Sequence, residues 1–234
     1  MPIVAFVSPK GGAGKTTAAM LLALGLAGEG RRVAIIDSDP NKPMMHWAAL
    51  PGRPKLITVH PAPTDIDLAP ALREAQGLGA DWIILDTEGS VRGGMAFIPV
   101  RADLVLTPLA ASTLETLQAL KAAEMVRDFT GRSHRNVLHA CILTRVPAAV
   151  RPKSVRQVVV DLHQAGIRIL PTAIIEKEAF RLIFTYGGGF DQLVENGAPG
   201  VEAARANAEA YVAAVQDLLA QARPAAAAVN PYRG

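Results

Sequence analysis

The sequence predicts a single-domain α/β fold, in which a mostly parallel, twisted sheet carries helices on both faces. Short apolar segments alternate with helix-like segments from end to end, which is typical of strand–helix–strand units. The chain has 234 residues, of which 50% are hydrophobic, enough for one large core. We expect residues 1–223 to form the domain and the Pro/Ala-rich residues 224–234 to form a disordered tail.

The first half of the chain begins with a strand at 3–8. The helix that follows, at 16–27, is rich in alanine and leucine and should end at the glycines that come after it. Pro43 can start a short helix that reaches residue 50. The other elements expected here are strands at 33–37, 56–60 and 82–86 and a helix at 65–75.

The second half continues this alternation. The helix expected at 113–129 is clearly amphipathic. The helix expected at 201–222 has an apolar stripe and little positive charge, so it should pack on the domain. The remaining elements are a short helix at 95–100, strands at 104–108, 137–144 and 169–170, and helices at 153–165 and 177–186.

A glycine-rich loop separates the first strand from the first helix. Residues 10–17 read Lys-Gly-Gly-Ala-Gly-Lys-Thr-Thr. Backbone N–H groups can close around an anion in such a loop, because glycines have no Cβ to block the approach. Lys15 should reach the β- and γ-phosphates, and the Thr16 hydroxyl should hold Mg²⁺. The residues predicted to bind the nucleotide here are Gly11, Gly12, Ala13, Gly14, Lys15, Thr16 and Thr17.

This loop departs from the general pattern G-x-x-x-x-G-K-[ST] at its first glycine, where Pro9 stands, and a second lysine, Lys10, follows. In this respect it resembles the deviant Walker A signature of the ParA/MinD ATPases. The resemblance implies that Lys10 reaches across a nucleotide-sandwich homodimer to the partner's phosphates. Two nucleotides that face each other carry dense negative charge, so ATP with two such lysines would hold the dimer and hydrolysis would loosen it.

Aspartates end two of the predicted strands, at the edge where open α/β sheets bind ligands. Asp37-Ser38-Asp39 matches the D-x-D motif of that family. The match implies that Asp37 lies near the Mg²⁺ water shell and that Asp39 positions the attacking water. Asp86 ends an apolar strand in the Walker B pattern and should bind Mg²⁺ directly or through water. Residues 88–94 lack the family's proline-rich turn, but their glycines give hinge freedom for a switch.

Later segments also resemble the family and imply an adenine site. Arg145 follows a strand where relatives contact the base, and residues 171–178 match the loop that covers it, with Ile174 and Glu176 as candidate contacts. The resemblance covers about residues 3–187. It is greatest to the small ParA-like ATPases of plasmids, a branch that includes the virulence ATPase that binds T-DNA borders.

These features predict slow ATP hydrolysis by a dimerising switch, with Lys10, Lys15 and Asp39 as the catalytic residues. No strong general base stands out, which suits a timer. The expected partners are a second copy of the chain, non-specific DNA and a small ParB-like stimulating protein, without a membrane. Net charge is +3, which is compatible with DNA binding but is not evidence for it. The candidate DNA contacts are Arg151, Lys153 and Arg156.

Other function classes are limited by composition. The single cysteine, Cys141, argues against the iron–sulfur relatives and fits a reducing cytoplasm, where a nucleoid-associated protein would work. No apolar run is long enough to span a bilayer. Because a strand begins at once and the phosphate loop follows about ten residues in, we expect neither a signal peptide nor a preceding DNA-reading domain. A MinD-like membrane switch, a positioning ATPase for protein cargo and a metabolic ATP-dependent enzyme stay open as alternatives.

Overall fold

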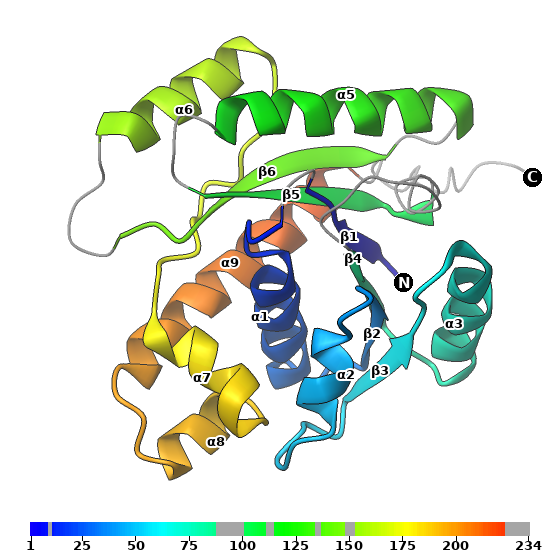
Figure 1. Cartoon of the computed structure of the whole chain (residues 1–234), viewed down its shortest axis with the longest axis vertical. Coiled ribbons are helices and arrows are strands. Elements are labelled where there is room, and N and C mark those ends of the chain that lie inside the picture. The colour runs from blue at the N-terminus through cyan, green and yellow to red at the C-terminus, as the bar shows by residue number, and fades with distance from the viewer. Residues whose placement is uncertain (9–10, 88–100, 111–114, 134–136, 148–152, 223–234) are drawn as a thin grey trace, which may run out of the picture.

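The computed structural model describes residues 1–8, 11–87, 101–110, 115–133, 137–147 and 153–222. A six-stranded parallel sheet in the order β3-β2-β4-β1-β5-β6 crosses the domain (Figure 1). The strands are β1 (Ile3–Phe6), β2 (Val33–Ser38), β3 (Ile57–Pro61), β4 (Trp82–Thr87), β5 (Leu104–Ala110) and β6 (Leu138–Thr144). The helices are α1 (Lys15–Gly28), α2 (Pro43–Ala48), α3 (Asp65–Gly77), α5 (Glu115–Ser133), α6 (Lys153–Gln164), α7 (Glu178–Tyr186), α8 (Phe190–Glu195) and α9 (Val201–Ala222).

Helices cover both faces of the sheet, so the predicted fold class is confirmed. Alternate strand residues divide the core into two layers, because successive side chains of a strand point to opposite faces. Val33 and Ile35 pack with α1, α2, α7, α8 and α9, whereas Ala34 and Ile36 pack with α3. A third cluster joins β6 to α5 and α6.

The strand register brings the predicted acidic residues to one edge. In β2 and β4, Asp37 lies opposite Asp86, and Phe6 of β1 lies opposite Asp86 on the other side of β4. All three strands run in the same direction, so their carboxyl ends meet there. The loop that follows β1 therefore starts beside two buried aspartates.

Several predicted boundaries shift by one or two residues, and three expectations need comment. Helix α8 was missed, because six residues between glycine-rich turns give too short a pattern. The strand expected at 169–170 is only an isolated bridge between Cys141 and Ile169. The helix expected at 95–100 and the tail at 224–234 lie outside the described residues.

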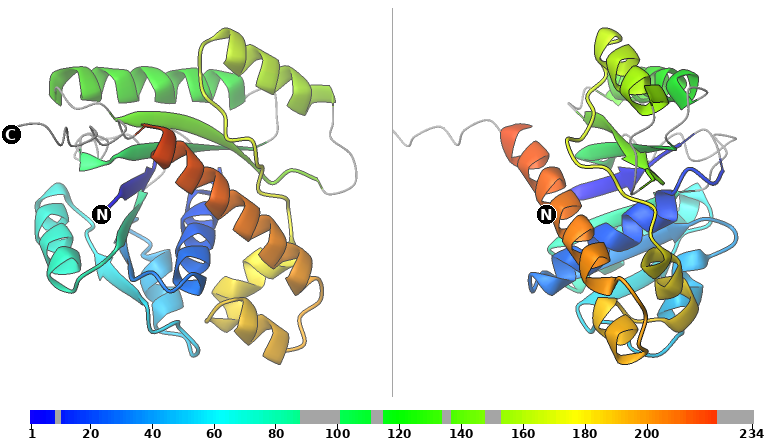
Figure 2. Two further views of the ribbon diagram at one scale, coloured as in Figure 1. Left: turned by 180° about the vertical axis from the view of Figure 1, so that it is seen from behind. Right: turned by 90° about the vertical axis from the view of Figure 1, so that its left-hand side faces the viewer.

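Helix α9 packs along α1 on one side of the domain, as its apolar stripe predicts (Figure 2). Gly25 of α1 permits the close approach, since a Cβ there would lie 2.4 Å from Cγ2 of Val212. No helix in the described part of the chain is both long and apolar enough to cross a bilayer. The apolar stripe of α9 is buried against the domain, as the sequence predicts.

Tyr211, on α9, buries a phenol that has no hydrogen-bond partner in the described structure. A buried hydroxyl without a partner costs about 1 kcal/mol or more. We therefore expect Tyr211→Phe to raise the free energy of unfolding by about 1 kcal/mol, as urea denaturation would measure. Tyr186→Phe is the matched control, because that ring is 45% exposed and its change should have little effect. A clear loss of stability in Tyr211→Phe would show that the phenol has a partner.

Candidate nucleotide-binding site

The phosphate loop lies at the start of α1, at the carboxyl edge of the sheet. Gly12 and Gly14 have positive φ angles of 76° and 91°, a backbone region that other residues rarely adopt. Gly14 is the N-cap of a 14-residue helix and makes no side-chain cap hydrogen bond, so no capping side chain covers the start of that helix. A helix N-terminus attracts anions through its N–H groups and its dipole.

Lys15 and Thr16 act directly on the buried carboxyl of Asp86. Asp86 is fully buried, and neither of its oxygens has a hydrogen-bond partner in the part of the chain that is described. Burial raises the pKa of Asp86 to about 7, while the Thr16 hydroxyl and the Lys15 ammonium both lower it. Thr16 approaches closely enough to favour the ionised form, yet its geometry does not satisfy either oxygen. A buried acid in this state needs a cation or a proton.

Asp37 is committed to the backbone of the next helix. Its Oδ2 accepts the N–H groups of Met44 and Met45 at 2.9 and 3.0 Å, and its Oδ1 accepts that of Asp39 at 3.3 Å. Burial raises the pKa of Asp37, and these three bonds lower it. Asp37 thus fixes the start of α2 against β2. Its place in the metal shell stays a prediction.

Asp39 lies at the mouth of the site and is only partly buried. Its Oδ1 accepts both the backbone N–H and the side-chain amide of Asn41, at 2.9 and 3.0 Å. Asp39 also lines a groove of about 660 Å³ together with Thr16 and Thr17. The fold therefore brings the second aspartate of the D-x-D motif next to the phosphate loop, as the sequence predicts.

Magnesium fits the acid that the structure leaves unpaired. Among the described residues, no three His, Cys, Asp or Glu side chains form a metal cluster. Mg²⁺ does not require such a cluster, because it is usually held by one or two carboxylates, substrate phosphates and water. The orphaned oxygens of Asp86, with the Thr16 side chain beside them, provide this kind of partial ligand set.

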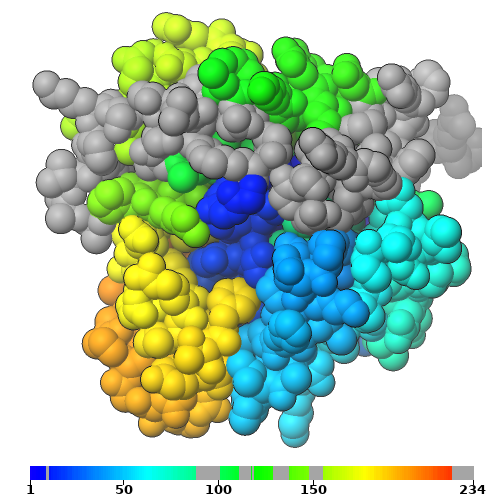
Figure 3. Space-filling view, in the orientation of Figure 1, coloured from blue at the N-terminus to red at the C-terminus, as the bar shows by residue number. Residues whose placement is uncertain are grey.

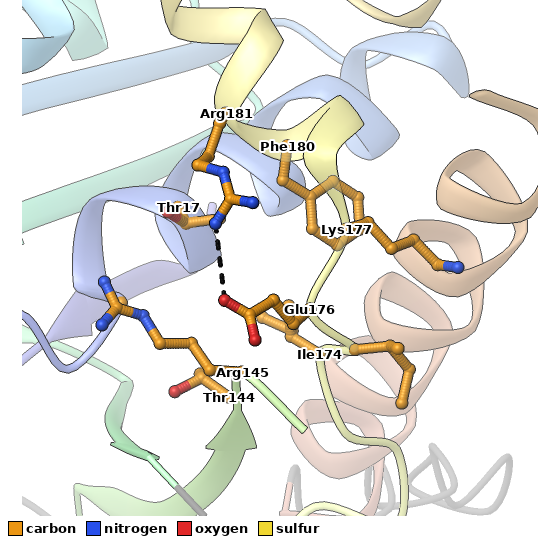
Figure 4. A pocket seen from close by; sticks show the side chains of 10 residues that line it. Thr17, Thr144, Arg145, Ile174, Glu176, Lys177, Phe180 and Arg181 are labelled. Carbon is orange, nitrogen blue, oxygen red and sulfur yellow. Dashed lines mark hydrogen bonds and ion pairs between the residues drawn. The ribbon is translucent and has the colours of Figure 1, made fainter. Parts of the chain in front are cut away.

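A second cavity adjoins the phosphate loop and contains the three residues predicted to contact the base. Arg145, Ile174 and Glu176 line it together with Gly14 and Thr17. Figure 4 shows that the lining side chains come from α1 (Thr17), from the end of β6 (Arg145), from the segment before α7 (Ile174 and Glu176) and from α7 itself (Phe180 and Arg181). In the space-filling view, the blue atoms of the loop and α1 lie in a hollow between α7 and α2 (Figure 3). The cavity is thus placed for the base of a nucleotide whose phosphates lie on the loop.

Sequence reasoning missed some of the residues that shape this cavity. Phe180 and Arg181 line it from α7, and Arg181 forms ion pairs with Glu178 at 2.6 Å and with Glu176 at 3.4 Å. Asn207 of α9 accepts the N–H of Ile175 and donates to a carbonyl of the same segment, both at 2.9 Å. A lone asparagine in an alanine-rich helix gives no signal of this role in the sequence.

The remaining predicted site residues are not placed at this site by the described part of the chain. Lys10, Arg151 and the switch segment 88–94 lie outside the described residues. Lys153 begins α6, where only its backbone is described, and Arg156 is exposed on the same helix. Cys141 is buried, and burial raises the pKa of its thiol to about 12, as expected for a small core residue.

Comparison with known proteins identifies the family to which this site belongs. A family model described as VirC1 protein matches residues 1–223. The chain belongs to the VirC1 family. Its VirC1 relatives include the virC1 protein of Rhizobium rhizogenes, which is 30% identical over 184 residues, or 77% of this chain and 79% of that protein. The resemblance to ParA/MinD P-loop ATPases is therefore confirmed.

Two further likenesses span nearly the whole VirC1-family chain. Protein ParA of Rhizobium radiobacter is 29% identical over 222 residues, which is 95% of this chain and 99% of the relative. The structure of a McdA–ATP complex from Cyanothece superposes with a TM-score of 0.69 at 18% identity, over 92% of this chain and 96% of that one. This VirC1-family chain is thus one of the ParA/MinD-type partition and positioning ATPases.

Proposed function

We propose that this chain is an ATP-dependent dimerising switch that binds DNA non-specifically and drives the partition or positioning of plasmid or chromosomal DNA. The observation that supports its nucleotide-binding part is the buried carboxyl of Asp86, which lies beside Lys15 and Thr16 and has no hydrogen-bond partner among the described residues. A buried acid without a hydrogen-bond partner lowers the stability of the nucleotide-free fold. Binding of a Mg²⁺–nucleotide complex would offset this loss.

Different groups of residues would bind the phosphates, the metal ion and the base of the nucleotide. Backbone N–H groups from Gly11 to Thr17 hold the phosphates, and Lys15 offsets their charge. Thr16 and Asp86 hold the Mg²⁺, which when bound neutralises charge on the phosphate oxygens. Arg145, Ile174 and Glu176 surround the base in the adjoining cavity.

Asp39 orients the water that attacks the γ-phosphorus. Its Oδ1 is held by Asn41, so the carboxylate is fixed in direction while it stays near the loop. In this proposal Asp39 orients the water and no strong general base assists it, so hydrolysis is slow. Slow hydrolysis suits a switch whose output depends on the lifetime of the ATP state. A small ParB-like partner would accelerate it.

Dimerisation depends on Lys10, which would offset charge on the partner's phosphates. We expect Lys10→Ala to bind ATP with nearly unchanged affinity but to weaken the ATP-dependent dimer by at least about tenfold, the equivalent of one charge-assisted hydrogen bond. Light scattering with Mg²⁺ and a non-hydrolysable ATP analogue measures this. Lys121→Ala, an exposed change on α5, is the control. A normal dimer in Lys10→Ala would remove Lys10 from the interface.

DNA binding would come mainly from phosphate contacts, with Arg151, Lys153 and Arg156 as the proposed residues. Such contacts weaken steeply with salt, because binding releases counterions. A dimer presents the patch twice, which links two weak sites into a stronger one. The protein would then act in the cytoplasm, on the nucleoid, in its ATP state.

One experiment tests the whole proposal: ATPase rate and molecular mass are measured with and without DNA and with liposomes as a third condition. The proposal predicts that ATP causes the chain to dimerise, that the dimer binds DNA, and that higher salt releases the dimer from the DNA. Strong ATP-dependent flotation with liposomes would favour a membrane switch instead. Dimerisation without DNA binding would favour a protein cargo, and rapid turnover of a small carboxylate or amide substrate would favour a metabolic enzyme.

A further inference from the structure

Thr144, the last residue of β6, contacts the phosphate loop from the edge of the sheet. Its side chain is 2% exposed, and its Oγ1 donates to the carbonyl oxygen of Ala13 at 2.8 Å. The carbonyl of Leu109 on β5 lies 3.2 Å from the same oxygen. A hydroxyl has one proton to donate, so the shorter contact to the loop is the stronger bond.

This bond fixes the direction of one peptide group in the loop. The C=O and N–H groups of a planar trans peptide point in opposite directions. Because the Ala13 carbonyl is held toward β6, the Gly14 N–H of the same peptide must point away from β6. In an anion-binding loop, the direction of each N–H decides whether it can reach the phosphate.

Close packing reinforces the hydrogen bond. A Cβ placed on Gly14 would lie 3.4 Å from both Cβ and Oγ1 of Thr144, so the side chain lies against the loop where φ is 91°. Gly12 also has a positive φ, but a Cβ placed on it would have no other described atom within 4 Å. The loop is thus supported at Ala13 and Gly14 by a side chain 131 residues away in the chain.

We propose that Thr144 is a positioning residue for phosphate binding, which sets the direction of the Gly14 N–H through its hydrogen bond to Ala13. The inference rests on the proposed nucleotide-binding function. Thr144 also lines the cavity proposed for the base, so the experiment must separate an effect on the phosphates from an effect on the base.

Inorganic tripolyphosphate makes this separation, because it has phosphates and no base, whereas adenosine has a base and no phosphates. Titration calorimetry with ATP, tripolyphosphate and adenosine compares wild type with Thr144→Val and Thr144→Ser. Valine has the same shape as threonine but no hydroxyl. Loss of one hydrogen bond should weaken binding of ATP and of tripolyphosphate by roughly 5- to 10-fold in Thr144→Val. Serine keeps the hydroxyl and should restore both affinities to within about twofold.

The remaining outcomes are distinct. If Thr144→Val weakens ATP and adenosine but leaves tripolyphosphate unchanged, Thr144 acts on the base and the inference is overturned. If the variant lowers only the melting temperature and leaves all affinities unchanged, its role is structural and the inference is likewise overturned. If wild-type protein binds neither ATP nor tripolyphosphate, the proposed function itself fails, and the inference fails with it.

Discussion

Replacing Lys15 with alanine is expected to abolish measurable binding of ATP. The Lys15 side chain is 6% exposed, at the first position of α1, and it acts electrostatically on the buried Asp86 carboxyl. Its loss removes a charge-assisted contact to the phosphates. We expect affinity to fall by roughly 100-fold or more, as titration calorimetry or fluorescent-nucleotide binding would measure.

The control for this change is Lys55→Ala, which removes an exposed lysine from the turn before β3. Circular dichroism should show the same helix content in both variants, so that a loss of binding is not a loss of folding. Retained ATP affinity in Lys15→Ala would contradict the assignment of residues 11–17 as the phosphate loop.

Asp86→Asn is expected to stabilise the nucleotide-free protein while it removes the Mg²⁺ contribution to ATP binding. Burial raises the pKa of Asp86 to about 7, so above that pH the folded protein carries a buried charge that has no hydrogen-bond partner among the described residues. The asparagine amide has the same shape and no charge. Its burial without a partner therefore costs less free energy than burial of the carboxylate. At pH 8.5 we expect a gain on the order of 3 kcal/mol, or roughly 5–10 °C in Tm.

The stability gained by Asp86→Asn should depend on pH. A carboxyl whose pKa is raised on folding binds more protons folded than unfolded between about pH 4 and pH 7. Wild-type stability should therefore fall as pH rises through that window, and the advantage of Asp86→Asn should vanish near pH 4. Asp81→Asn is the control, because an Arg32 contact lowers the pKa of that exposed acid. A destabilised Asp86→Asn at pH 8.5 would show that the carboxylate is already satisfied in the fold.

Many of the residues at the carboxyl edge of the sheet could be predicted from the sequence, because each motif lies within a short stretch of the chain. The loop at 10–17 lies between a strand and a helix start, and the aspartates at 37, 39 and 86 lie at the ends of strands or directly after them. Parallel pairing then places those strand ends together, and the register of Asp37 with Asp86 follows that logic. Local pattern and sheet geometry agree, so the position of these aspartates at one edge of the sheet could be predicted from the sequence, whereas their roles in nucleotide and metal binding stay predictions.

Residues that act across long separations could not be found in this way. Asn207 supports the base segment from α9, and Trp47 donates from its indole to the Gly188 carbonyl at 3.0 Å, which ties α2 to the end of α7. Each is an ordinary residue in its own helix. Its role depends on which distant backbone group lies within hydrogen-bond reach, and periodicity contains no information about that.

The sequence by itself determined the fold class, the phosphate loop and the acids that face it, because each depends on residue type at short spacing. Only the tertiary structure decided how those acids differ. Asp37 is satisfied by three backbone N–H groups, whereas Asp86 is buried with none among the described residues. The physical reason is that the cost of a buried charge depends on its partners, and for these carboxyls the partners come from whichever loops and helices the fold packs against the strand ends.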